Sequence, residues 1–232
     1  MKFLYCGFGY DQVNDRYNVL AVVLNGYNLN ETKTLIYTYR EKNWTTIQKF
    51  PCDPRCDPGQ LEVGKFLSGT LNWIINKNVV SKKVIVSFDL EKETYGEMSL
   101  PQDYCDNNTV LYVSSNLIYL SFDDSNKTHR VVWKMKEYRL VESWTKLMII
   151  PHDMLTWDVR PGRLSDALFI SEYGVLLLRP QRSKLTVHNL NNDGGLDHRS
   201  TIFGEFAHLL HIYHESLVSP QWYVIYSVGI SQ

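Results

Sequence analysis

Short apolar segments alternate with polar turns along this chain, and the alternation repeats about every fifty residues. Pro51, Pro101 and Pro151 are spaced by fifty residues each, and an aromatic residue precedes each proline by six or seven positions. These aromatics are Trp44, Tyr95 and Trp144. Before each of them, an apolar strand rich in β-branched and aromatic residues runs into a charged turn, a pattern that predicts a pair of antiparallel strands. The sequence therefore predicts outer hairpins in residues 35–51, 84–101 and 130–151.

A second type of hairpin lies between the outer ones. Two short apolar strands flank a Ser, Gly or Asn turn in residues 63–74, 109–122 and 167–179, and turns of this composition suit short hairpin loops. In the N-terminal copy the turn runs from Asp11 to Arg16. A fourth outer hairpin is expected in residues 184–195, which lack the aromatic and contain an Asn/Asp/Gly turn instead. Each repeat thus supplies about four strands.

This repeat predicts the architecture. Four strands in a unit of about fifty residues are typical of a kelch-type β-propeller blade. A two-sheet sandwich also has short, regularly spaced strands, but it does not explain why proline, aromatic and hairpin recur in register. We therefore expect an all-β, kelch-like propeller of four-stranded antiparallel blades, in one domain over residues 1–232. Closure needs about four to eight blades. The chain offers four repeats and further strands expected from Phe203 to Gly229, so we expect a ring that is incomplete or open.

The repeated aromatics and the N-terminal glycines are given structural interpretations. Aromatic side chains dominate the burial of packed sheets, so Trp44, Tyr95 and Trp144 are expected to fill the space between neighbouring blades. Gly7 and Gly9 resemble part of a phosphate-binding loop, but the third glycine and the following helix of such a loop are missing. We expect these glycines to allow a bend or a close backbone approach.

Composition narrows the classes of partner. The 24 basic and 25 acidic residues nearly cancel and are mixed along the chain, which argues against nucleic acid or an anionic membrane as the partner. No apolar run approaches the roughly 20 residues of a membrane span, and the N-terminus lacks a signal-peptide core. The four cysteines are too few for a disulfide scaffold. We expect a soluble intracellular protein, cytoplasmic or nuclear, with reduced thiols.

Metal and cofactor sites are not expected. His208, His211 and His214 are spaced by three, and on a strand the middle side chain points to the opposite face from the other two. Cys52 and Cys56 have no partner pair with zinc-site spacing. The chain also contains no nucleophile elbow, P-loop, HExxH or paired-carboxylate motif, which favours binding over catalysis.

Five segments in order resemble one family. They are GFGYDQVNDRYNVLAVV (7–23), SGTLNWI (68–74), VIVSFDLEKETYGEMSLP (84–101), WKMKEYRLVESWTKL (133–147) and IYHESLVSP (212–220). Together they look like the F-box-associated domain of plant F-box proteins. The resemblance implies a module that recruits a target protein to a Skp/cullin/F-box (SCF-type) ubiquitin ligase. It also implies that the Skp adaptor binds only through an N-terminal F-box, which is absent from this sequence; the chain is expected to begin at the first or second blade.

One loop is the predicted contact with the target protein. Residues 152–164 lie outside the repeat and contain Met154, Trp157, Arg160 and Arg163. Trp and Arg are over-represented among interface anchors, and loops on a rigid scaffold commonly carry function. Two alternatives to target recognition stay open: a metal oxidase with Tyr and His ligands on the kelch scaffold, and a truncated, non-functional fragment.

Overall fold

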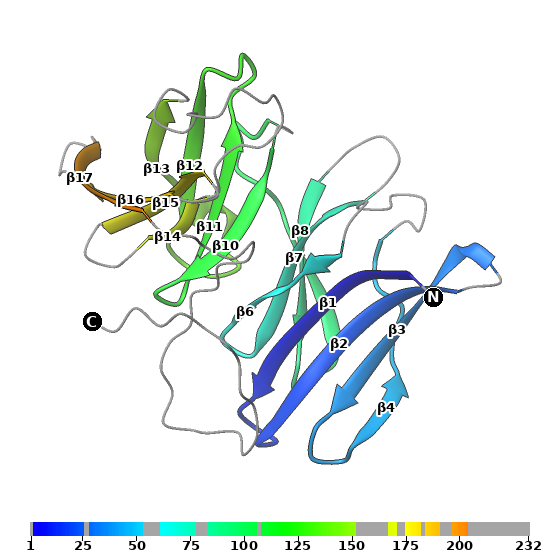
Figure 1. The fold of residues 1–232 in the computed structure, drawn as a ribbon. Coiled ribbons are helices and arrows are strands. Elements are labelled where there is room, and N and C mark those ends of the chain that lie inside the picture. Colours follow the sequence, from blue (N-terminus) through cyan, green and yellow to red (C-terminus); the bar gives the residue numbers. More distant parts are fainter. Residues whose placement is uncertain are drawn as a thin grey trace.

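Four β-sheets follow one another along the chain (Figure 1). The computed structural model describes residues 2–25, 28–52, 61–77, 83–105, 108–151, 167–170, 175–181, 184–190 and 196–203. The first sheet has the strand order β4-β3-β2-β1-β5, with β1 (Lys2–Asp11), β2 (Arg16–Asn25), β3 (Asn28–Thr38), β4 (Asn43–Thr46) and β5 (Glu62–Val63). The second contains β6 (Lys65–Leu67), β7 (Thr70–Asn76), β8 (Lys83–Asp89) and β9 (Thr94–Met98).

The third and fourth sheets repeat this order. The third contains β10 (Val110–Ser114), β11 (Leu117–Asp123), β12 (His129–Met135) and β13 (Trp144–Pro151), with a 3₁₀ turn at Val141–Ser143. The fourth contains β14 (Ala167–Ile170), β15 (Val175–Gln181), β16 (Lys184–Leu190) and β17 (Leu196–Phe203). In these two sheets each strand pairs antiparallel with the next one along the chain. The predicted all-β fold, an incomplete or open kelch-like propeller of four-stranded antiparallel blades, is confirmed.

The first strands of neighbouring sheets lie next to one another, with β6 contacting both β1 and β10, and β10 contacting β14. One strand was not predicted: β5 adds to the first sheet by pairing in parallel with β1, with Tyr5 opposite Glu62. The linker into the second sheet therefore joins the edge of the first.

Two-residue turns with left-handed backbone close the inner hairpins. Ser68 (φ 45°) and Gly69 (φ 77°) join β6 to β7, and Ser115 (φ 47°) and Asn116 (φ 59°) join β10 to β11. Positive φ at both central residues defines the turn whose twist matches that of paired strands, and Gly and Asn adopt it most readily. The Ser-Gly and Ser-Asn pairs thus produce the hairpins predicted from them.

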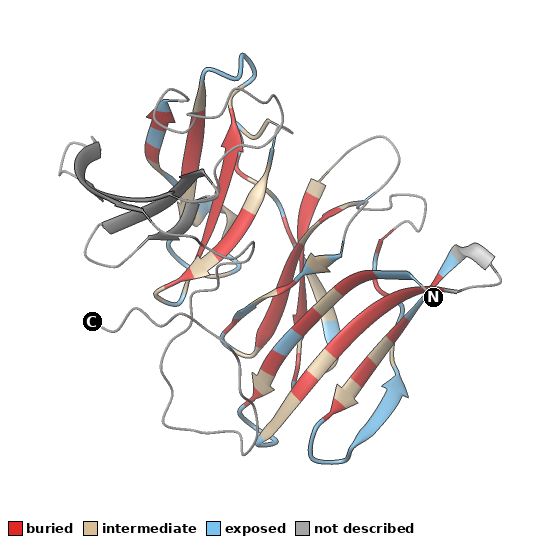
Figure 2. Ribbon diagram, viewed as in Figure 1, coloured by how far each residue is buried: buried red, intermediate tan, exposed pale blue. Residues whose placement is uncertain are grey.

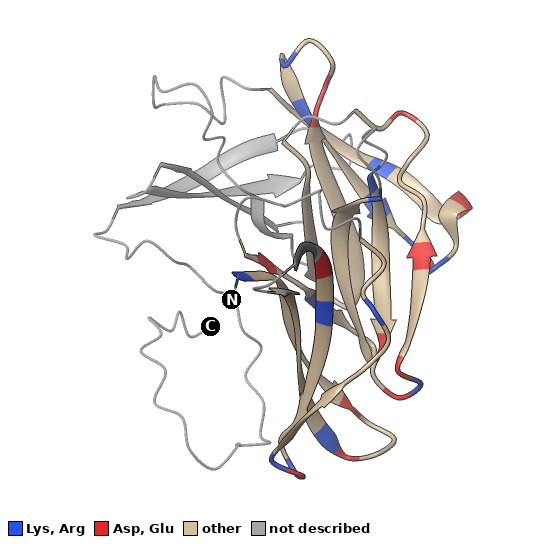
Figure 3. Cartoon of the chain, turned by 90° about the vertical axis from the view of Figure 1, so that its right-hand side faces the viewer, with Lys and Arg blue, Asp and Glu red and all other residues tan. Residues whose placement is uncertain are grey.

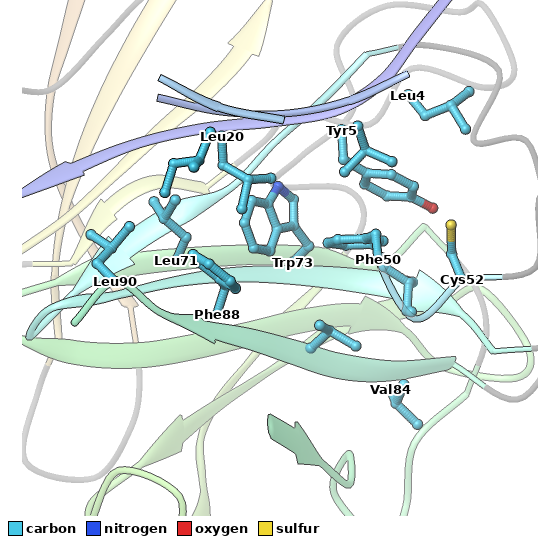
Figure 4. Close-up of a cluster of buried hydrophobic side chains, with 14 of the residues drawn as sticks. Leu4, Tyr5, Leu20, Phe50, Cys52, Leu71, Trp73, Val84, Phe88 and Leu90 are labelled. Atoms are coloured by element: carbon cyan, nitrogen blue, oxygen red, sulfur yellow. The ribbon is translucent and has the colours of Figure 1, made fainter. Parts of the chain in front are cut away.

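The largest core lies between the first and second sheets. Leu20 and Val22 of β2 pack with Leu71, Trp73 and Phe88 of the second sheet, all of them at most 2% exposed. Figure 4 shows Trp73 beside Phe50 and Leu71 in the space between the two sheets. The Trp73 indole N–H also donates to the Cys6 carbonyl of β1, with an N···O distance of 2.9 Å.

Glycines permit this close packing. A Cβ on Gly9 would lie 2.6 Å from Leu90 Cδ1, and one on Gly7 would lie 2.9 Å from Trp73 Cζ2. Both distances are too short for real contacts. A Cβ on Gly64 would collide with the Trp73 indole ring. The N-terminal glycines thus have the structural role expected of them, but the groups that approach them closely are side chains of the second sheet and not another backbone.

Replacing Gly64 with alanine is expected to lower the free energy of unfolding by about 1–3 kcal/mol, the usual cost of overpacking a core. The neighbour is a rigid indole that cannot rotate away. Urea unfolding followed by tryptophan fluorescence would measure the loss. Gly96→Ala is the control, since its Cβ would meet the Ser87 hydroxyl oxygen at 3.0 Å and should cost less. Equal losses for the two variants would contradict the packing argument.

The second and third sheets are joined by a core and by polar contacts. Trp144 of β13 packs among Met98, Leu120 and Met135, and its indole N–H donates to the Ser99 carbonyl at 3.2 Å. In the turn before β13, the Tyr138 hydroxyl donates to Asn72 Oδ1 at 2.9 Å. The turn between β12 and β13, the longest described turn of the third sheet, therefore contacts the second sheet.

A buried ion pair lies within the third sheet. Arg130 is 1% exposed and its Nε donates to Asp123 Oδ1 at 3.0 Å. The Asn108 side-chain amide donates to Asp123 Oδ2 at 2.6 Å, and Arg130 donates to the Asn108 carbonyl at 3.1 Å. These three residues tie the start of β10 to the β11–β12 hairpin.

Candidate protein-binding surface

The face of the first sheet that points away from the second sheet carries aromatic side chains. One row of residues crosses four strands in register: Phe8 of β1 pairs with Val19 of β2, Val19 with Tyr37 of β3, and Tyr37 with Trp44 of β4. Side chains of paired residues project from the same side of a sheet. Alternation along β1 and β2 also adds Tyr10 and Tyr17 to this side. Tyr39, in the turn that follows β3, donates its backbone N–H to the Tyr17 carbonyl at 2.9 Å. We call Phe8, Tyr10, Tyr17, Tyr37, Tyr39 and Trp44 the aromatic face.

The rings of the aromatic face pack against one another and leave much of their surface in solvent. Phe8 and Tyr17 are stacked with ring centroids 5.5 Å apart, and Tyr37 and Trp44 lie 5.2 Å apart. Phe8 is 57% exposed, Tyr39 50% and Trp44 49%. Figure 2 shows β4 exposed along its length, at the outer edge of the sheet. Clustered exposed aromatics of this kind mark surfaces that bind other proteins.

The structure corrects one expectation about the repeated aromatics. Trp144 is buried between sheets and Tyr95 packs partly buried against the core of the first two sheets, as predicted. Trp44 is half exposed. It lies on the first sheet, and its side chain points away from the second, whereas Tyr95 and Trp144 each point toward the preceding sheet. The prediction that Trp44 fills a space between blades is therefore wrong.

An ion-paired turn borders the aromatic face. The Asp11 carboxylate accepts hydrogen bonds from the backbone N–H groups of Val13 and Asn14, each at 3.1 Å, and from Arg16 Nε at 3.0 Å. Burial alone would raise the pKa of Asp11, but hydrogen bonds from Asn14 and Arg16 outweigh it and the pKa is lowered. The carboxylate therefore stays ionised and fixes the β1–β2 turn.

Side chains of both charges lie around the β1–β2 turn. Arg16 also lies 3.5 Å from Glu93 in the second sheet and 3.9 Å from Glu41. The Tyr10 hydroxyl donates to the Asp15 carboxylate, a hydrogen bond that raises the pKa of the phenol. Figure 3 shows basic and acidic segments interspersed over the described strands and turns. The described surface thus has charges of both signs and no field of one sign.

Comparison with known protein families shows the family to which this chain belongs. The family described as F-box associated beta propeller domain matches residues 2–220. The chain belongs to this family. An F-box/kelch-repeat protein of Arabidopsis thaliana is 30% identical over 194 residues, covering 80% of this chain and 48% of the relative. An F-box protein of the same plant is 23% identical over 219 residues, covering 84% and 49%.

This F-box-associated domain spans about half the length of the relatives that it matches. Among solved structures, exo-beta-1,3-galactanase from Phanerochaete chrysosporium aligns with a TM-score of 0.42 and 9% identity, over 85% of this chain and 49% of that one. YjhT aligns with a TM-score of 0.40 and 11% identity, over 87% and 66%.

Several residues of the F-box-associated domain that the sequence analysis weighed as site candidates lie outside the described residues. They are Met154, Trp157, Arg160 and Arg163 of the predicted contact loop, His208, His211 and His214, and Cys56. Cys52 is described and is buried, with 8% of its surface exposed. Within the described ranges, no three His, Cys, Asp or Glu side chains gather closely enough to hold a metal ion. The same part of the chain contains no helix of the length and apolarity that crossing a membrane requires.

Proposed function

We propose that this F-box-associated domain is the target-recognition module of an F-box protein and recruits a target for ubiquitination by an SCF-type ligase. The observation that carries the proposal is the family match over residues 2–220, supported by relatives whose names identify them as F-box proteins. In this role the domain binds a protein and performs no chemistry of its own. A Skp adaptor would bind to an F-box, and this domain would hold the target. The proposal places the protein inside the cell, in the cytoplasm or the nucleus.

The physical design of the described part suits this role. The described strands are tied to neighbouring sheets by two large cores, and a rigid scaffold allows its loops and exposed faces to bind without a large ordering cost. Met154, Trp157, Arg160 and Arg163 are the proposed contacts with the target. Tryptophan and arginine at the centre of an interface commonly account for most of its binding energy.

The loop prediction can be tested by quantitative affinity purification from plant cells. Target recovery by the Trp157→Ala/Arg160→Ala variant should fall at least about tenfold, the effect of removing interface anchors. Lys77→Ala is the control, because Lys77 is 52% exposed and pairs only with surface Glu97 among the contacts the structure describes. Recovery of the same proteins at the same level by both variants would exclude the loop as the contact with the target. Recovery of no specific protein by the unaltered chain, where a full-length relative captures one, would count against the proposed function itself.

A further inference from the structure

One edge of β3 is open along part of its length. β3 runs from Asn28 to Thr38, but β4 pairs only with the stretch from Leu35 to Thr38. After β4 the chain makes one more backbone contact with β3, where the Ile47 N–H donates to the Thr34 carbonyl at 3.1 Å. Among the described strands, none pairs with this side of β3 before Thr34, and Figure 1 shows β3 extending past β4. The first part of β3 is therefore an unpaired strand edge.

The backbone groups of Thr32 point to this open edge. Alternate residues of a strand direct their N–H and C=O groups to the same neighbouring strand. Because the Thr34 carbonyl bonds on the β4 side, the N–H and C=O of Thr32 are directed to that side as well. The following chain does not cover them, since the Phe50 N–H donates to the Thr34 hydroxyl at 2.9 Å and the Phe50 ring enters the core. Backbone groups exposed in this way are a template for a further strand.

A cavity of about 310 Å³ lies along the open edge. Its lining consists of Glu31, Thr32, Lys33 and Thr34 of β3 together with Thr46, Ile47 and Lys49 of the chain that leaves β4. This volume is at the lower end of the range of about 300–1,000 Å³ that is usual for binding sites. The free backbone groups of β3 thus face a space that a short extended segment can enter.

The charges around the cavity select what can bind there. Lys33 and Lys49 are exposed, and neither forms an ion pair within the described part of the chain. Glu31 also lines the cavity, but it is engaged in another interaction. Lysines at a strand edge oppose pairing with the same edge of a second copy, because like charges would then meet. They favour a strand that carries acidic side chains.

We propose that the open edge of β3 binds an extended acidic segment of a partner protein, which adds to the first sheet as an antiparallel strand in line with β4. Backbone hydrogen bonds to Thr32 hold the segment, and its carboxylates pair with Lys33 and Lys49. This mode of recognition takes affinity from the main chain and specificity from the side chains. The inference goes beyond the proposed function, since it requires neither the loop at residues 152–164 nor an F-box.

Fluorescence anisotropy with the full chain and labelled peptides of about eight residues, a usual strand length, tests the proposal. The probes are an alternating Val-Glu peptide, a Val-Lys peptide, and a Pro-Glu peptide whose prolines prevent strand pairing. We expect the Val-Glu peptide to bind with a dissociation constant of about 10–100 μM. The other two should bind at least about tenfold more weakly, because one lacks the carboxylates and the other the backbone donors. Equal binding of the three peptides, or no binding of the Val-Glu peptide up to about 1 mM, overturns the proposal.

Variants of the chain locate the binding site. Lys33→Ala/Lys49→Ala should raise the dissociation constant of the Val-Glu peptide about tenfold, the combined effect of two exposed ion pairs. Lys42→Ala/Lys92→Ala is the matched control, since it removes the same charge from exposed turns outside the cavity, and it should leave the constant unchanged. Thr32→Pro should abolish binding, because proline removes an N–H that faces the open edge and is tolerated on an edge strand. Circular dichroism would verify that each variant is folded.

Hydrogen exchange of the Thr32 amide supplies an independent readout. Exchange that slows as the Val-Glu peptide saturates the chain supports the proposal, since pairing protects the N–H of an edge strand. Unchanged exchange at saturation means that the peptide binds elsewhere and overturns the proposal. So does equal weakening by the two double lysine variants, which would show a general effect of net charge. If Thr32→Pro does not fold, the lysine variants and the exchange of the unaltered chain decide.

Discussion

Replacing Arg130 with leucine is expected to lower the free energy of unfolding by about 3–5 kcal/mol, the usual cost of removing one partner of a buried ion pair. Arg130 and Asp123 are 1% and 0% exposed, so the substitution would leave a carboxylate in the core without its guanidinium. The loss is expected to be this large because water cannot reach the buried Asp123 carboxylate to solvate it. Urea unfolding monitored by tryptophan fluorescence would measure it.

The double variant Arg130→Leu/Asp123→Leu is the control for that result. Removing both charges deletes the attraction together with the desolvation cost, so the double variant should be more stable than the single one. If the two variants lose the same free energy, the cost comes from lost packing and not from the removal of the guanidinium that faces the Asp123 carboxylate.

Replacing Trp73 with alanine is expected to cost about 3–5 kcal/mol, the range for truncating a buried aromatic side chain. Trp73 is 2% exposed, meets the Phe50 ring edge-on with centroids 5.4 Å apart, and donates its indole N–H to the first sheet. The variant would open a cavity between two sheets and leave the Cys6 carbonyl without this donor. A lower midpoint temperature of the cooperative thermal unfolding transition would report the effect.

Two comparisons separate the contributions at Trp73. Trp73→Phe keeps an aromatic ring but not the donor, and should retain more stability than Trp73→Ala. Trp44→Ala deletes the same side chain from a half-exposed position. This substitution should change stability by no more than about 0.5 kcal/mol. A cost for Trp44→Ala equal to that for Trp73→Ala would contradict the burial difference between the two sites.

The sequence predicted the hairpins because their signals are local. Ser68-Gly69 and Ser115-Asn116 determine tight turns, and the apolar alternation on either side determines the strands. The period of about fifty residues also predicted that the sheets follow one another along the chain. The parallel addition of β5 could not be predicted, since two residues carry no periodic signal and their pairing with β1 depends on where the second sheet packs.

The candidate surface was predicted less well than the fold. Trp44 matches Tyr95 and Trp144 in its place in the repeat. An aromatic at this place is buried only if its sheet packs against a preceding sheet. Tyr95 and Trp144 lie on the second and third sheets, whereas Trp44 lies on the first. A usable signal was present: Phe8 and Tyr10 alternate along β1, and Tyr17 and Val19 alternate along β2, which places these four residues on one side of the sheet. The proposed contact loop rests on residue type alone.

The pairwise arrangement of the cores has an evolutionary consequence. Each large core is made by two successive sheets, and the next sheet offers the same kind of aliphatic and aromatic surface to its neighbour. Duplication or deletion of one fifty-residue unit would therefore leave the surfaces on either side of the junction chemically matched. Genes with this organisation can gain or lose a sheet by recombination and still place two apolar faces against each other at the new junction.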